Sequence, residues 1–205
     1  MSQSEAVFLD FSCRKLDQMA GSIVVCLDAL DDAEIWARSN ESSNAVGNLV
    51  LHLAGNVRQW LLCGVGGAPD LRQRDTEFSA RALRRVELSE LLTRTIQESI
   101  AVLQALPHGR LLEAIEIQGF RLTVLEAIYH VVEHFSGHTY QIILLAKSHR
   151  DQAFEFYSYL SGPHETETPL TAFCLEFEAK RHLHRPITLR PRNRPAADDI
   201  DAVLG

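Results

Sequence analysis

The segment TVLEAIYHVVEHFSGHTYQIILLAK, residues 123–147, decides the fold class. Its apolar residues recur every three or four positions, which is the period of an amphipathic helix. Thr123 and Glu126 have the spacing of a capping box, with the threonine as N-cap and the glutamate three residues later. The segment is therefore predicted to be a helix that begins after Thr123 and continues to about Lys147.

Three more segments have the same helical period, at residues 4–30, 45–65 and 88–106. Ser4 is the expected N-cap of the first. The glycines and the proline of GVGGAPD end the second segment, and Pro107 ends the third. Because no β-rich region accompanies these four long helices, the sequence predicts an all-α protein built as an antiparallel helix bundle.

The segments outside the helices are of three kinds. Residues 71–87, LRQRDTEFSARALRRVE, form a charged connection, and residues 111–124 alternate weakly around a glycine, which fits an extended link or a short hairpin. Five of the seven prolines lie in residues 161–205. We expect a bundle domain over residues 1–160, followed by a C-terminal extension with a short fifth helix at about 169–184 and an extended tail.

Charge and cysteine usage limit the class of partner and the compartment. The net charge of −7 opposes binding to a phosphate backbone, so nucleic acid is not an expected partner. Four widely spaced cysteines without a C-x-x-C pair fit a reducing, cytoplasmic setting. The N-terminus lacks the continuous apolar region of a signal peptide, and no segment is long and apolar enough to span a membrane. The sequence thus predicts a soluble cytoplasmic protein with no membrane partner.

A row of polar side chains follows one face of the helix at 123–147. At roughly 100° per residue, His130, His134, His138 and Gln141 fall within about 40° of His134. A single histidine on such a face is more often solvated or a hydrogen-bonded core residue than a metal ligand. Two imidazoles four residues apart are a better indication, because they lie one turn apart and suit a shared divalent ion. His134 and His138 are therefore a candidate ligand pair.

A second polar row lies on the helix at 45–65. Its members are Asn48, His52, Asn56, Gln59 and Cys63. One helix cannot surround a metal, so a third ligand has to come from a different helix, and His52 is the best candidate because it is the only histidine in the first two helices. Asn56 and Gln141 are candidates for orienting the ligands or a water molecule.

The segments SNAVGNLVLHLAGNVRQWLLCGVGG, RDTEF and IQGFRLTVLEAIYHVVEHFSGHTYQI resemble the DinB-like (DinB/YfiT) superfamily, in its uncharacterised branch with the motif H-F-S-x-H-T-G-Q-I. The resemblance covers about residues 5–160. It implies an up-down-down-up four-helix bundle, commonly dimeric, with a three-histidine metal site. Carried over by motif, the metal ligands are His52, His134 and His138, while His130 lies beside them as a pocket residue or a supporting residue. The sequence departs from the motif at Tyr140, where the resembling pattern usually has glycine.

Three imidazoles leave a divalent ion with an open position, as in catalytic sites. Metal-bound water and metal-bound thiol are both activated, so hydrolysis and thiol transfer are each chemically feasible. The superfamily that the sequence resembles includes S-transferases that use bacillithiol or mycothiol, and it also includes a thiol-dependent isomerase. The leading hypothesis is transfer of a low-molecular-weight thiol to an electrophile by a homodimer that binds zinc or nickel. One alternative is a non-catalytic ligand-binding or stress-related dimer. The other is a metallohydrolase, but neither polar row contains an obvious carboxylate that could act as its general base.

Overall fold

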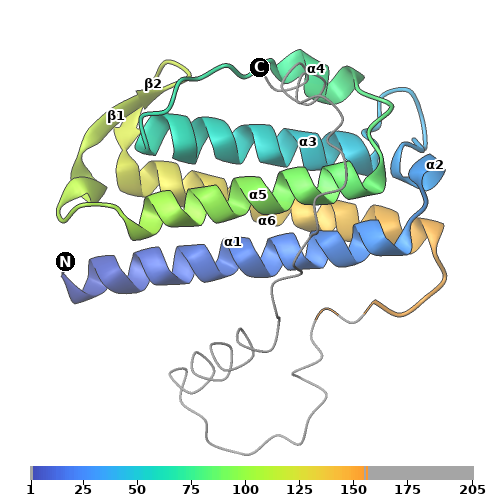
Figure 1. Cartoon of the computed structure of the whole chain (residues 1–205), viewed down its shortest axis with the longest axis horizontal. Coiled ribbons are helices and arrows are strands. Elements are labelled where there is room, and N and C mark those ends of the chain that lie inside the picture. The colour runs from blue at the N-terminus through green and yellow to red at the C-terminus, as the bar shows by residue number, and fades with distance from the viewer. Residues whose placement is uncertain (1, 155, 157–205) are drawn as a thin grey trace, which may run out of the picture. The chain divides into compact units, whose positions relative to one another are not determined.

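Four long helices form the core of the protein (Figure 1), which the computed structural model describes over residues 2–154 and at residue 156. They are α1 (Gln3–Ala29), α3 (Val46–Val57), α5 (Arg85–Gln104) and α6 (Val124–His149). The π-helix η1 (Arg58–Val65) continues α3 without a break. The all-α prediction is confirmed, while the expected fifth helix and tail lie outside the described residues.

The helices run in the up-down-down-up order. α1 packs against α5 and α6, and α3 packs against the same two helices. At one end of the bundle, the Arg85 side chain at the start of α5 donates to the carbonyl of Asp28 near the end of α1. Arg150, which follows α6, donates to Glu34 in the short helix α2 (Asp32–Ile35) at the same end. α1 and α6 therefore run in one direction, and α3 and α5 in the other (Figure 1).

Capping boxes fix where the first and last helices begin. At α6, Thr123 Oγ1 accepts from the Glu126 backbone N–H at 3.2 Å, and the Glu126 carboxylate accepts from the Thr123 N–H at 2.7 Å, as predicted. At α1 the N-cap is Ser2 and not the expected Ser4. The reason is Glu5, which stands three residues after Ser2 and returns the second hydrogen bond of the box.

A β-hairpin connects α5 to α6, so the hairpin alternative for residues 111–124 is confirmed. Strands β1 (Ala114–Ile117) and β2 (Phe120–Thr123) pair antiparallel. The two turn residues between them, Gln118 and Gly119, both have positive φ, at 54° and 79°. This is the conformation of a two-residue type I′ turn, whose twist matches that of the paired strands. The hairpin packs on η1, where the absence of a side chain at Gly64 leaves room for Ile117.

The charged connection contains a short helix that the sequence did not predict, α4 (Arg74–Ser79), which packs against α3. Asn48, fully buried on α3, donates from its amide nitrogen to the carbonyls of Glu77 at 2.9 Å and Ala80 at 3.1 Å. The bundle interior is filled by large apolar side chains that are almost completely buried, among them Leu16, Ile23, Leu51, Leu92 and Phe135. None of the helices described has the length and apolar character needed to cross a membrane.

Candidate metal centre

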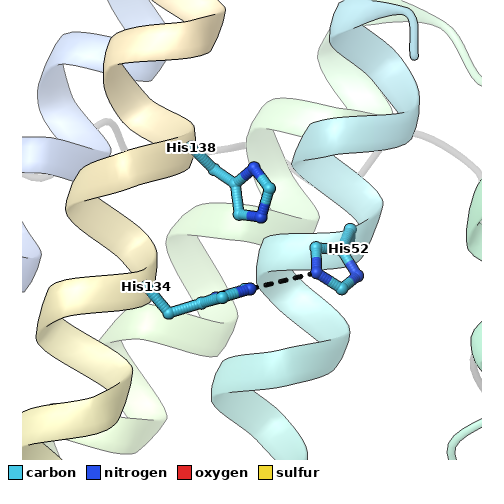
Figure 2. Close-up of side chains that lie close together, drawn as sticks. All are labelled: His52, His134 and His138. Carbon is cyan, nitrogen blue, oxygen red and sulfur yellow. Dashed lines mark hydrogen bonds between the residues drawn. The ribbon is translucent and has the colours of Figure 1, made fainter. Parts of the chain in front are cut away.

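Three histidines from two helices converge inside the bundle. His52 lies in the middle of α3, and His134 and His138 lie one turn apart on α6, facing it (Figure 2). One ring nitrogen from each lies within 4.8 Å of the other two. In the part of the chain that the structure describes, this is the group of histidine, cysteine and acidic side chains that could hold a metal ion.

The spacing of the nitrogens fits a shared ion. His52 Nε2 and His134 Nε2 are 3.2 Å apart (Figure 2). Two imidazole nitrogens bound to one tetrahedral ion, each at about 2.0–2.1 Å from it, are separated by about 3.3 Å. The rings of His134 and His138 are also close, with centroids 4.5 Å apart and an edge-on arrangement. The side chains therefore already stand close to the positions that ligation requires.

Hydrogen bonds orient two of the three rings. His138 Nδ1 lies 2.7 Å from Gln141 Oε1, and His52 Nδ1 lies 3.0 Å from Glu77 Oε2. Both partners are oxygen acceptors, so we assign the proton to Nδ1 in each ring, which leaves the Nε2 lone pair free. His134 Nδ1 is buried and has no hydrogen-bond partner among the described residues.

The surroundings favour neutral imidazoles, which is the form that binds metal. Burial, followed by the charge that His138 and then His52 would carry, lowers the pKa of His134 from its ordinary 6.5 to about 3. Burial also lowers the pKa of His138, although its hydrogen bond with Gln141 acts in the opposite direction. At neutral pH both rings on α6 are therefore neutral, and each has one nitrogen with a lone pair.

The other residues predicted for the site lie around the three histidines without joining the cluster. The His130 ring packs on Trp60 at a centroid distance of 4.1 Å and lies 5.7 Å from the His134 ring. Asn56 is 5% exposed, and its Oδ1 has no partner among the described residues. Tyr140 is 60% exposed and points to the outside of α6. Of the predicted supporting residues, Gln141 is the one that hydrogen-bonds to a cluster histidine.

The π-helix η1 carries two side chains near the cluster, Gln59 and Trp60. Trp60 packs on His130, and Gln59 bonds to Asp70 and to Arg72. In η1 the backbone bonds to a residue five positions back. The predicted helical span to residue 65 is therefore confirmed, with π-helical and not α-helical geometry over Arg58–Val65.

Sequence reasoning missed two charged residues beside His52. Glu77 on α4 is completely buried and bonds to His52, and Arg72 bonds to both carboxylate oxygens of Glu77, at 2.6 and 2.8 Å. They were overlooked because a charged connection normally faces water. One signal was available: Gly55, one turn after His52 on a helix of large apolar residues, leaves space for another group at that point.

The sequence of the chain matches the model of a known protein family. Residues 3–163 match the model of a family described as "Protein of unknown function (DUF1572)". The chain belongs to this DUF1572 family. The match includes all four bundle helices and the three histidines, and it confirms the resemblance to DinB-like proteins, of which DUF1572 is one family.

Two solved structures show that the DUF1572 chain has the DinB-like fold. A DinB-like protein from Bacillus cereus ATCC 10987 matches with a TM-score of 0.56 at 13% identity, covering 67% of this chain and 90% of that one. A DinB-like protein from Bacillus subtilis, YjoA, matches with a TM-score of 0.53 at 14% identity and the same coverage. A search of curated proteins gives no match. At these identities the likeness is one of fold alone.

Proposed function

We propose that His52, His134 and His138 bind one divalent transition metal, with zinc or nickel as the best candidates. The observation that carries the proposal is the convergence of three ring nitrogens, from two helices, within 4.8 Å. Imidazole is a suitable ligand for both metals. The low pKa values of the two histidines on α6 support it further, because no proton has to leave these rings at neutral pH before a metal binds.

The proposed reaction is transfer of a low-molecular-weight thiol to an electrophile. The cation, when bound, supplies a Lewis acid with an open position at which a thiol loses its proton. In the overall reaction the thiol sulfur forms a bond to the electrophilic carbon, the leaving group departs with the electron pair of its own bond, and the thiol proton passes to water. The chain itself has to hold the ligands in place and admit the substrates.

The burial of the three rings supports access from one side. His52 is 6% exposed and is backed by Glu77 and by the ring of Phe78, whose centroid lies 4.9 Å away. His134 and His138 are only partly buried. The partial exposure of His134 and His138 supports access of a small thiol to these two rings, and we assign His130, which packs on Trp60 next to His134, to the surroundings of that access.

The position of Glu77 counts against a metallohydrolase. Such an enzyme needs a general base near the metal-bound water. Glu77 is the carboxylate that bonds to the histidine cluster, yet it is completely buried behind His52 and both its oxygens are occupied by Arg72. The carboxylate is thus placed to support a ligand and not to reach a substrate.

A conjugation assay tests the proposal. Protein without a histidine tag is loaded with zinc or nickel and mixed with cysteine, glutathione or bacillithiol and with 1-chloro-2,4-dinitrobenzene, and thioether formation is followed by absorbance. We expect a rate above the uncatalysed reaction that is lost with a chelator and in His134→Ala. Turnover that survives both would contradict metal-dependent transfer. Metal binding without turnover of any thiol would favour the non-catalytic ligand-binding protein.

The oligomeric state, the ligands and the compartment of the protein are also part of the proposal. We propose a homodimer in the cytoplasm, with a small-molecule thiol and an electrophile as ligands and without a nucleic-acid or membrane partner. Cys26 and Cys63 are free, buried thiols, which supports a reducing compartment. Light scattering on the full chain decides the oligomeric state, and a monomer at micromolar concentration would exclude the dimer.

A further inference from the structure

We propose that Glu77 and Arg72 are positioning residues that hold His52 in the tautomer and orientation required of a metal ligand. The inference rests on the metal site proposed above. Glu77 is completely buried, and a buried carboxylate is costly unless it is paired and hydrogen-bonded. Here Arg72 pairs with it through two parallel contacts, Nε to Oε1 at 2.6 Å and Nη2 to Oε2 at 2.8 Å. This bidentate geometry fixes the plane of the carboxylate.

The fixed carboxylate determines which nitrogen of His52 carries the proton. Glu77 Oε2 lies 3.0 Å from His52 Nδ1, and an ionised carboxylate only accepts hydrogen bonds. Arg72 Nη2 also lies 3.2 Å from His52 Nδ1, and one of its two N–H groups is used by Glu77. Glu77 is the nearer partner of His52 Nδ1, so we place the proton of His52 on Nδ1, with the Nε2 lone pair toward His134. This is the carboxylate–histidine arrangement that orients ligands in many metal sites.

Helix α3 has a gap that admits the Glu77–Arg72 pair. A Cβ atom at Gly55 would lie 2.1 Å from Glu77 Oε1 and 3.0 Å from Arg72 Nε. Those distances are shorter than van der Waals contact, so any side chain at this position would push the pair away from His52. The glycine, the carboxylate and the guanidinium thus form one unit on the outer side of the ligand.

Arg72 is itself held from the hairpin side. Its Nη1 donates to Gln59 Oε1 at 2.9 Å, and the same oxygen accepts from the side chain of Gln118 in the hairpin turn. Asp70 accepts from Gln59 Nε2 at 2.7 Å and from the Arg72 backbone N–H at 3.1 Å. These hydrogen bonds restrict the orientation of the guanidinium. A chain of hydrogen bonds thus runs from Gln118 in the hairpin through Gln59, Arg72 and Glu77 to His52.

The test is Glu77→Gln in the full-length protein, with two readouts. Zinc affinity is measured by competition with a chromophoric chelator, and the His52 tautomer is read in the metal-free protein from the nitrogen-15 shifts of its ring. We expect a dissociation constant about 10–100-fold higher than that of the wild type, the usual effect of removing such a partner. We also expect loss of the pure Nδ1–H tautomer, which a merely structural role of Glu77 would leave unchanged.

Glu133→Gln is the matched control. It makes the same chemical change on α6, next to His134 but on the exposed side of the helix, and should leave both readouts at wild-type values. If Glu77→Gln does not fold, Arg72→Lys replaces it, because lysine keeps the charge and loses the bidentate geometry. In that variant too we expect weaker zinc binding and a mixed tautomer.

The outcomes separate this inference from the metal proposal. A folded Glu77→Gln or Arg72→Lys protein with wild-type zinc affinity and an unchanged His52 tautomer would overturn the positioning role while leaving the metal site intact. Wild-type protein that binds no zinc would overturn the metal site. In that case the tautomer measurement still decides whether Glu77 fixes the ring of His52, and a mixed tautomer in the wild type would refute the inference.

Discussion

The fold changes the acid–base chemistry of His134 strongly. The His134 ring forms a triangle with those of His52 and His138. Each of those two rings bonds through Nδ1 to a side chain outside the cluster, whereas His134 Nδ1 has no partner among the described residues. Burial and the neighbouring imidazoles lower its pKa to about 3. Burial and the charge that the neighbouring imidazoles can carry disfavour a second proton on this ring, so the folded chain keeps His134 neutral.

This low pKa predicts a loss of stability in acid when metal is absent. Between pH 6.5 and pH 3 the unfolded chain binds a proton at His134 that the folded chain does not, so the free energy of unfolding falls as the pH is lowered through this window. Above pH 6.5 the contribution is constant. Urea unfolding in chelator at several pH values measures the effect. In His134→Gln we expect a shallower fall, whereas parallel curves for the two proteins would contradict a neutral His134.

The two glycines Gly55 and Gly21 should respond to alanine in opposite ways. A Cβ at Gly55 would collide with Glu77, so Gly55→Ala should lower the free energy of unfolding by about 1–3 kcal/mol. Gly21, on the exposed face of α1, has no atom within 4 Å of a Cβ, and Gly21→Ala should raise it by about 0.5–1 kcal/mol. Urea unfolding of both variants is the measurement. Equal effects would show that the collision at Gly55 is absent in solution.

At the scale of the element, α6 carries two of the three histidines, and its register depends on where it begins. Thr123 and Glu126 set that start through a complete capping box. His134 and His138 follow eleven and fifteen residues later on a continuous helix, and the ring nitrogens can meet His52 only if the register is kept. The start of α6 is therefore part of the construction of the site.

We expect Thr123→Ala to destabilise the protein by about 1 kcal/mol, because two hydrogen bonds of the threonine hydroxyl are lost. Thr123→Ser keeps the hydroxyl and should remain within about 0.5 kcal/mol of the wild type. Chemical denaturation of the three proteins compares them. An alanine variant as stable as the serine variant would mean that the box contributes nothing to α6.

The elements also show what the sequence could and could not predict. The helices and the pairing of His134 with His138 follow from local periodicity, since residues four apart on a helix share a face. His52 could be predicted as the third ligand because helices of a bundle face each other and the first two helices contain no other histidine. Glu77 could not be placed in this way, because its burial depends on how a charged connection folds back over α3. The π-helical geometry of Arg58–Val65 could not be predicted either, because the sequence has the period of an ordinary helix there.

At the scale of the whole molecule, a metal held between α3 and α6 would tie together two helices that are far apart in the sequence. A ligand that binds only the folded chain stabilises it by about 2.7 kcal/mol at 100 times its dissociation constant. For a protein of this size we expect zinc at that excess to raise Tm by roughly 5–10 °C. Calorimetry with His134→Ala as the comparison measures this shift. A similar increase in the variant would indicate that zinc binds elsewhere.

If three histidines from α3 and α6 hold a single metal ion, the purified protein should contain it in a fixed ratio to the chain. Protein without a histidine tag is incubated with zinc, and the unbound zinc is removed by gel filtration. The zinc content is then measured by inductively coupled plasma mass spectrometry, and His134→Ala is treated in the same way for comparison. We expect about one zinc per chain in the wild type, since one ion satisfies the three ligands, and a negligible amount in the variant. Equal and negligible zinc in both proteins would contradict the three-histidine site.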